Sequence, residues 1–221
     1  MKGARIFRFN DFQSNCIVLW DAAGKCVIVD PGFIDNEEKA ELYDHFKEEG
    51  LTPEKIFLTH GHFDHIYGVA TLAKDFGIPV YMAPQEKELV AAQGQSAALF
   101  GLPKPDCSFE TVDIADGDIV SVGDMDFKVI ATPGHTPGGV CWYEEKARLI
   151  LTGDTLFAGS IGRTDMPGGD YDALIHSLLE KLMQIEGDVD VLPGHGPYTT
   201  IADERTKNPF LQPFNEPYEE N

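Results

Sequence analysis

The sequence has few basic residues. It contains 17 Lys and Arg against 37 Asp and Glu, which gives a formal net charge of −20. An acidic surface repels the phosphates of nucleic acids and the anionic headgroups of lipid membranes. The composition therefore argues against partners of both kinds.

Long apolar runs and cysteine motifs are also missing. No stretch approaches the roughly 18 apolar residues of a membrane-spanning helix, and residues 1–15 lack the apolar run of a signal peptide. No pair of the four cysteines has the C-x-x-C spacing of a zinc or redox motif. Cys16, Cys26 and Cys141 lie in apolar segments, so we expect buried free thiols. These features predict a soluble, cytoplasmic protein.

The length of 221 residues and the hydrophobic fraction of 43% predict one domain with a normal core. We assign this domain to residues 1–208 and expect an acidic, proline-rich C-terminal tail with little structure at residues 209–221. Strand-like runs come first and strand–helix alternation follows, which predicts an α/β architecture of sheets covered by helices. Nothing in the sequence indicates the oligomeric state.

The predicted elements follow from the hydrophobic periodicity. Strands are expected at residues 6–9, 15–20, 26–29, 56–58, 80–82, 108–112, 119–122, 127–131, 140–142, 149–151 and 189–192. Helices are expected at residues 36–49, 66–76, 85–93 and 171–186. Residues 94–106 mix glycine, proline and apolar side chains, and we expect a loop or short helix there, near the mouth of a site.

Four apolar runs end abruptly in a turn that carries histidine or aspartate. They read IFLTHGH, KVIATPGH, LILTGD and VDVLPGH. Functional groups in open α/β sheets gather beyond the carboxyl ends of the strands. Four such ends in one chain therefore predict a single shared site.

The strongest motif is THGHFDH at residues 59–65, with the skeleton His-x-His-x-Asp-His. Imidazole and carboxylate groups suit zinc, iron or manganese. His60 and His62 can reach one ion from the turn, and Asp64 and His65 can reach a second ion from the following helical turn. Chance would produce this skeleton in roughly 6 of 10,000 chains of this composition, so we interpret it as a metal motif.

Three residues beyond this motif complete two metal sites. The predicted ligands of the first ion are His60, His62 and His135, those of the second are Asp64, His65 and His195, and Asp154 bridges the ions. A bridging carboxylate offsets part of the repulsion between two dications. We expect zinc, with iron or manganese as alternatives.

Some polar residues have two interpretations. Asp154 could instead cap a helix, and His135 and His195 could be ordinary turn residues. Asp30 could accept a hydrogen bond from a ligand histidine or simply form a turn. His45 and His176 lack ligand spacing, and we expect both to be ordinary surface or edge residues.

At these residues the sequence resembles the metallo-β-lactamase superfamily, and within it the glyoxalase II-like branch of hydroxyacylglutathione hydrolases. The matching positions are Asp30, the 60–65 motif, His135 in TPGHTPGG, Asp154 in LTGDTLF and His195 in LPGH. The resemblance implies a four-layer αββα sandwich with two metal ions at one edge between the sheets. It also implies hydrolysis of a thioester or ester substrate.

The sequence departs from typical glyoxalase II enzymes at several points. Only 26 residues follow His195, so the added C-terminal helical domain of those enzymes is missing. Pro197 stands where a tyrosine is usual, and Asp165 replaces an aromatic residue. Arg163 matches a basic residue near the substrate. The run GSIGRTDMPGGD is similar to short, single-domain bacterial members of this branch.

These features lead to a mechanistic hypothesis. Two metal ions lower the pKa of a shared water to about 7, and the resulting hydroxide attacks the carbonyl group. Asp64 could also orient the hydroxide. Arg163 is expected to bind an anionic group of the substrate; the alternative is a structural salt bridge within its own turn.

Other functions remain open at this point. A persulfide dioxygenase of the same fold would bind a single iron through His60, His135 and Asp154. A lactonase or another ester hydrolase would use the same two-metal site. A related nuclease and a non-catalytic module braced by metal are further alternatives.

Overall fold

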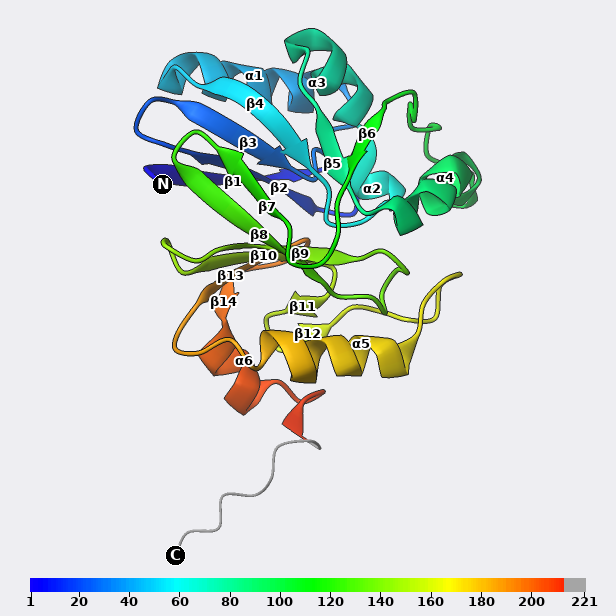
Figure 1. Ribbon diagram of the computed structural model, residues 1–221. Helices are drawn as coiled ribbons and strands as arrows, with labels where there is room; N and C mark the ends of the chain where they lie inside the picture. The colour runs from blue at the N-terminus through cyan, green and yellow to red at the C-terminus, as the bar shows by residue number, and fades with distance from the viewer. Residues whose placement is uncertain (213–221) are drawn as a thin grey trace, which may run out of the picture.

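The chain folds into four layers in the order helix, sheet, sheet, helix. The structure is a computed structural model, and it describes residues 1–212. Helices α1 (Asn36–Glu49) and α3 (Val69–Phe76) cover the outer face of one sheet, and α5 (Tyr171–Ser177) and α6 (Ile201–Lys207) cover the other (Figure 1). This arrangement confirms the predicted αββα sandwich.

The first sheet is mixed. Its strands lie in the order β1 (Gly3–Phe9), β2 (Ser14–Trp20), β3 (Lys25–Val29), β4 (Thr52–Phe57), β5 (Val80–Met82) and β6 (Thr111–Asp113). Strands β1 to β3 are antiparallel neighbours, whereas β3 to β6 run parallel. Parallel neighbours require crossover connections, and α1, α3 and α4 (Lys87–Leu99) lie in these connections.

The second sheet is antiparallel except for one pair. Its order is β14 (Thr199–Thr200), β13 (Asp190–Pro193), β10 (Leu149–Gly153), β9 (Val140–Glu144), β8 (Met125–Ala131) and β7 (Ile119–Val122). Strands β10 and β13 run parallel, and α5 with the π-helical turn η2 (Leu178–Leu182) forms their crossover. The short strands β11 (Leu156–Phe157) and β12 (Ser160–Ile161) form a separate hairpin.

Three apolar clusters hold the layers together. One packs α1 and α3 on the first sheet, one fills the space between the sheets, and one packs α5 and α6 on the second sheet. Strand β2 is buried along its whole length because it contributes to two of these clusters on its opposite faces. Cys16, Cys26 and Cys141 are buried free thiols, as predicted.

Helix boundaries differ from the prediction where tertiary contacts intervene. The expected helix at 66–76 is divided into α2 (Phe63–Ile66) and α3, because Gly68 packs against the Phe33 ring and donates to the carbonyl of Pro31. The expected helix at 85–93 begins as a 3-10 turn, η1 (Pro84–Glu86), and α4 continues past Gly94, where the side chain of Lys104 packs. Strand β6 begins later than predicted, and α6 was not predicted.

His45 corrects an expectation from the sequence. It is buried rather than at the surface, and its ring makes edge contacts with Phe7 and Trp20, both at 5.4 Å between centroids. Burial is the main cause that lowers the pKa of His45, so the ring behaves as an aromatic core residue. His176 is exposed on α5, as expected.

The C-terminal segment only partly matches its expectation. Leu211 is fully buried in the cluster beneath the second sheet, although the sequence placed it in the tail 209–221. Residues 213–221 lie outside the described residues. Within the described chain, no helix has the length and apolar character needed to cross a bilayer.

One aromatic pair joins the two sheets directly beneath the strand ends. The rings of Phe57 on β4 and Trp142 on β9 stack with 3.8 Å between their centroids. The indole Nε1 of Trp142 also donates a 3.1 Å hydrogen bond to the carbonyl of Leu58. Trp142 therefore fixes the end of β4, which leads directly into the THGHFDH motif.

Substitution of Trp142 tests this connection. We expect Trp142→Ala to lower the free energy of unfolding by about 3–5 kcal/mol, because it opens a cavity between the sheets. Trp142→Phe keeps an aromatic ring but leaves the Leu58 carbonyl without its donor, and we expect a loss of about 1–3 kcal/mol. Urea denaturation followed by circular dichroism measures both. A loss below about 1 kcal/mol for Trp142→Ala would contradict this role.

Candidate metal centre

The predicted ligands gather at one edge of the sandwich. The motif 59–65 follows β4, and the residues His135, Asp154 and His195 follow β8, β10 and β13. Strands β8, β10 and β13 point in the same direction because β9 is antiparallel to both of its neighbours and β10 is parallel to β13. All seven predicted ligands therefore meet in one place.

His60, His62 and His135 form the first cluster. One nitrogen of each ring lies within 4.8 Å of the others. Nε2 of His135 is 3.0 Å from Nδ1 of His62. Two imidazole nitrogens this close need a proton or a cation between them, because their lone pairs repel each other.

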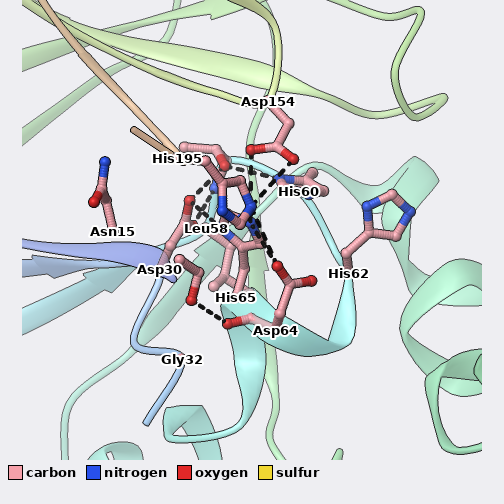
Figure 2. A network of polar contacts seen from close by, with 12 residues as sticks. Asn15, Asp30, Gly32, Leu58, His60, His62, Asp64, His65, Asp154 and His195 are labelled. Carbon is pink, nitrogen blue, oxygen red and sulfur yellow. Dashed lines mark hydrogen bonds and ion pairs between the residues drawn. The ribbon is translucent and has the colours of Figure 1, made fainter. Parts of the chain in front are cut away.

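Asp64, His65 and His195 form the second cluster. Their candidate ligand atoms also lie within 4.8 Å of one another. Nε2 of His65 is 3.2 Å from Nε2 of His195, and both nitrogens lie within 3.4 Å of Oδ2 of Asp64. Figure 2 shows these side chains directed toward one another.

The carboxylate of Asp154 lies close to histidines of both clusters. Its Oδ2 is 3.6 Å from Nε2 of His135 and 3.5 Å from Nε2 of His195. Its Oδ1 is 3.6 Å from Nε2 of His65. Asp154 does not cap a helix, because the short strand β11 follows it.

Two buried atoms in the clusters lack any hydrogen-bond partner among the described residues. They are Nε2 of His60 and Oδ1 of Asp154. A buried polar atom without a partner costs free energy, about 1–3 kcal/mol in proteins. A nitrogen lone pair and a carboxylate oxygen are donor atoms that divalent cations bind. The residues present therefore fit the metal ions that the sequence predicts.

Outer hydrogen bonds fix the orientation of the rings. Nδ1 of His135 donates to the carbonyl of Arg163 at 2.7 Å, and Nδ1 of His195 donates to the carbonyl of Phe12 at 3.0 Å. Both rings thus present Nε2 to the clusters. His62 differs because its Nδ1 faces His135.

Asp30 fulfils both of its proposed roles. Its Oδ2 lies 3.1 Å from Nδ1 of His65 and accepts from the hydroxyl of Thr59 at 2.6 Å, while Oδ1 accepts from the Thr59 amide. The backbone of Asp30 has a φ of 50°, which places it in a left-handed turn. The turn directs the carboxylate of Asp30 toward Thr59 and His65 of the motif.

The first hairpin supports the second cluster from the other side. Asn10 Nδ2 and Ser14 Oγ both donate to the carbonyl of Asp64. Asn15 Nδ2 donates to the carbonyls of Pro193 and Gly196, which flank His195. These asparagine and serine contacts were not predicted, since they join segments that are 50 or more residues apart in the sequence.

The clusters perturb the titration of their own members. Burial, followed by the neighbouring imidazole of His135, lowers the pKa of His62 to about 3. Burial also disfavours protonated His65, but the carboxylates of Asp64, Asp154 and Asp30 outweigh burial and raise its pKa to about 10. Side chains with shifted pKa values that gather at one edge of a fold are typical of functional sites.

The comparisons with known proteins agree with this geometry. A sequence model of the metallo-beta-lactamase superfamily matches residues 9–195. The chain belongs to the metallo-β-lactamase superfamily. This match confirms the predicted fold family. Members of this superfamily bind divalent metals and act as metal-dependent hydrolases, so the coarse class of function is also confirmed.

Individual superfamily members match nearly the whole chain. The hydroxyacylglutathione hydrolase GloC of Haemophilus influenzae is 37% identical over 206 residues, which cover 90% of this chain and 93% of that protein. The structure of BLEG-1 B3 metallo-beta-lactamase has a TM-score of 0.87 at 36% identity, with 95% and 99% coverage. TTHA1623 in a di-iron-bound form has a TM-score of 0.84 at 37% identity, with 94% and 100% coverage.

Arg163, the predicted substrate residue, lies at the rim of a cavity beside this superfamily site. Its guanidinium makes a bidentate ion pair with Asp165, at 2.7 and 2.9 Å, and both side chains are exposed. The structural salt bridge that was the alternative interpretation is therefore present. The backbone carbonyl of Arg163 has a second role, because it holds His135.

Glu86 is a buried carboxylate that the sequence analysis did not identify. It is fully buried, and its two oxygens accept from the amides of Gly61, at 2.7 Å, and Gly138, at 2.6 Å. Gly61 lies between His60 and His62, and Gly138 lies in the turn that follows His135. Glu86 therefore ties together the two turns that form the first cluster. Such a role depends on backbone amides, so no side-chain motif reveals it.

Glu86→Gln tests this tie. An amide has only one oxygen to accept hydrogen bonds, so one of the two turns loses its acceptor. We expect affinity for the metal at the first cluster to fall about 10–100-fold, the usual effect of removing an outer hydrogen-bond partner. Competition with a chromophoric chelator measures this affinity.

Glu88→Gln is the matched control, because Glu88 lies two residues beyond Glu86, at the start of α4, and is exposed. It should leave both metal affinities unchanged. Equal affinity in Glu86→Gln and the wild type would show that the first cluster does not depend on this carboxylate.

Proposed function

We propose that the chain is a two-metal hydrolase of thioesters. The observation that carries this proposal is the pair of adjacent three-residue clusters with Asp154 between them. A single catalytic ion would need only one such cluster. The similarity to a hydroxyacylglutathione hydrolase, which matches over 93% of its own length, supports a thioester substrate.

In this proposal the two clusters hold one divalent ion each. His60, His62 and His135 hold the first, and Asp64, His65 and His195 hold the second. Asp154, whose carboxylate lies within 3.6 Å of His135 and of both histidines of the second cluster, would help to hold both ions. Zinc suits this set of nitrogen and oxygen donors, and iron or manganese suits it as well.

The chain's own groups divide the remaining tasks. The two ions, when bound, would polarise the substrate carbonyl and lower the pKa of the attacking water. Burial favours a neutral Asp64, but the imidazoles of His65 and His195 outweigh burial and lower the pKa of Asp64 to about 2. Asp64 thus stays ionised at neutral pH and can accept a hydrogen bond from the water. The arrangement requires no side-chain nucleophile.

The mononuclear alternative explains less of the structure. A dioxygenase site built from His60, His135 and Asp154 would give Asp64 and His195 no role. The hairpin contacts that hold the carbonyl of Asp64 and the ring of His195 would then support nothing. We therefore favour the hydrolase.

Elemental analysis together with thioester hydrolysis tests this function. We expect about two metal ions per wild-type chain. His60→Ala and His195→Ala should each remove one ion, and each should lower the hydrolysis rate at least about a hundredfold, because catalysis by two ions requires both.

His176→Ala is the control, because His176 is exposed on α5 away from both clusters. It should keep the metal content and the rate of the wild type. One iron per chain, oxygen consumption with a persulfide and no thioester hydrolysis would refute the proposal in favour of the dioxygenase. Hydrolysis of β-lactams alone would refute the thioester substrate.

A further inference from the structure

A cavity of about 410 Å³ opens beside the two clusters. Its floor includes His62, Asp64, Asp154 and His195. The volume lies within the range of about 300–1,000 Å³ that is usual for small-molecule sites. The cavity is therefore the place where the rest of a substrate would lie when its carbonyl group is at the clusters.

Three aromatic rings form one wall of this cavity. The Phe12 ring makes edge contacts with Phe63 and Phe100, both at 5.2 Å between centroids, and Phe63 and Phe100 are 5.7 Å apart. Phe63 directly follows His62, and the carbonyl of Phe12 accepts from His195. The apolar wall is thus built from the same segments that orient the predicted ligands.

The end of α4 brings further apolar side chains to the rim. Leu99 is 86% exposed and Phe100 is 51% exposed, and both line the cavity. Helix α4 is held against the motif by Gln93, whose side-chain oxygen accepts from the amide of Phe63. Large apolar side chains gathered at a cavity mouth mark a ligand or partner site rather than ordinary surface.

The cavity offers little to an anionic group. Among the described residues that line it, Arg163 is the only Lys or Arg, and Asp165 already holds its guanidinium with two hydrogen bonds. The net charge of −20 also repels an approaching anion. A thiol carrier with several carboxylates or phosphates would find no unpaired lysine or arginine among the described residues that line this cavity.

We propose that this cavity binds an apolar acyl group, either an aliphatic chain or an aryl ring, of the substrate. Leu99 and Phe100 then determine how long an acyl group the enzyme prefers. This inference rests on the proposed thioester hydrolysis and specifies its substrate class. It places the scissile carbonyl beside the two clusters and the acyl group against the wall formed by Phe12, Phe63 and Phe100.

The test compares acyl thioesters of one uncharged thiol, with acyl chains of two to eight carbons, in the metal-loaded enzyme. Each buried methylene should raise kcat/KM about threefold to fourfold until the cavity is full. S-lactoylglutathione, which has a short polar acyl group and a charged carrier, should be hydrolysed less efficiently than the octanoyl thioester.

Leu99→Ser and Phe100→Ser should flatten the dependence of kcat/KM on acyl chain length. Ile119→Ser is the matched control, because Ile119 is 67% exposed on β7 and does not line the cavity. The control should keep the slope of the wild type. Metal content, measured for every variant, shows whether the clusters are intact.

The outcomes separate the inference from the proposed function. Thioester hydrolysis that is independent of chain length, or a preference for S-lactoylglutathione, overturns the inference and leaves the function intact. If no thioester is hydrolysed, the function fails, and calorimetry with an octyl thioether then decides whether the cavity binds an apolar chain. If the wild type is a dimer and Leu99→Ser is a monomer with the same dependence of kcat/KM on chain length, the cavity rim is an interface between copies. That result would also overturn the inference.

Discussion

The burial of many ionisable side chains at one edge of the sandwich is the constraint on which the rest of the structure depends. Removing imidazole and carboxylate groups from water is costly unless opposite charges and hydrogen bonds replace the water. Here the carboxylates of Asp30, Asp64 and Asp154 surround His65, and backbone carbonyls hold the outer nitrogens of His135 and His195. The orphaned nitrogen of His60 shows that protein groups alone leave the arrangement incomplete.

The layered fold meets this constraint by placing strand ends opposite one another. Strand β4 of one sheet and strands β8, β10 and β13 of the other all stop at the same edge. The predicted ligands therefore lie on the short turns that follow these strands or, for Asp64 and His65, on the short helix α2. The stacked rings of Phe57 and Trp142 fix the separation of the sheets just below this edge. The packed core beneath the site therefore fixes the distance between the two sheets. Hydrogen bonds to the carboxylates of Glu86 and Asp30 fix the turns that carry the predicted ligands.

The sequence predicted what is local or strongly patterned. The spacing within residues 60–65 and the apolar runs before His135, Asp154 and His195 identified the residues that the structure brings together. Sequence patterns could not reveal contacts made through the backbone, such as those of Glu86 with Gly61 and Gly138. They also misplaced His45, because a histidine surrounded by aromatic rings is recognised only from its neighbours in space. Helix α4 continues through Gly94, where the side chain of Lys104 occupies the space that a Cβ would fill.

The contact between the first hairpin and His195 has a consequence for how the chain acquires its structure. The carbonyl of Phe12 and the ring of His195 are 183 positions apart in the sequence, and Ser14 forms a β-bridge with His195. Contacts of such long range form late and slow folding, because a large loop must close before they stabilise anything. During synthesis on the ribosome, the hairpin that supports the site emerges first. Its partner His195 emerges only after nearly the entire chain has been made. The second cluster is thus completed only after synthesis has passed the last strand ends, so its assembly belongs to the closing steps of folding.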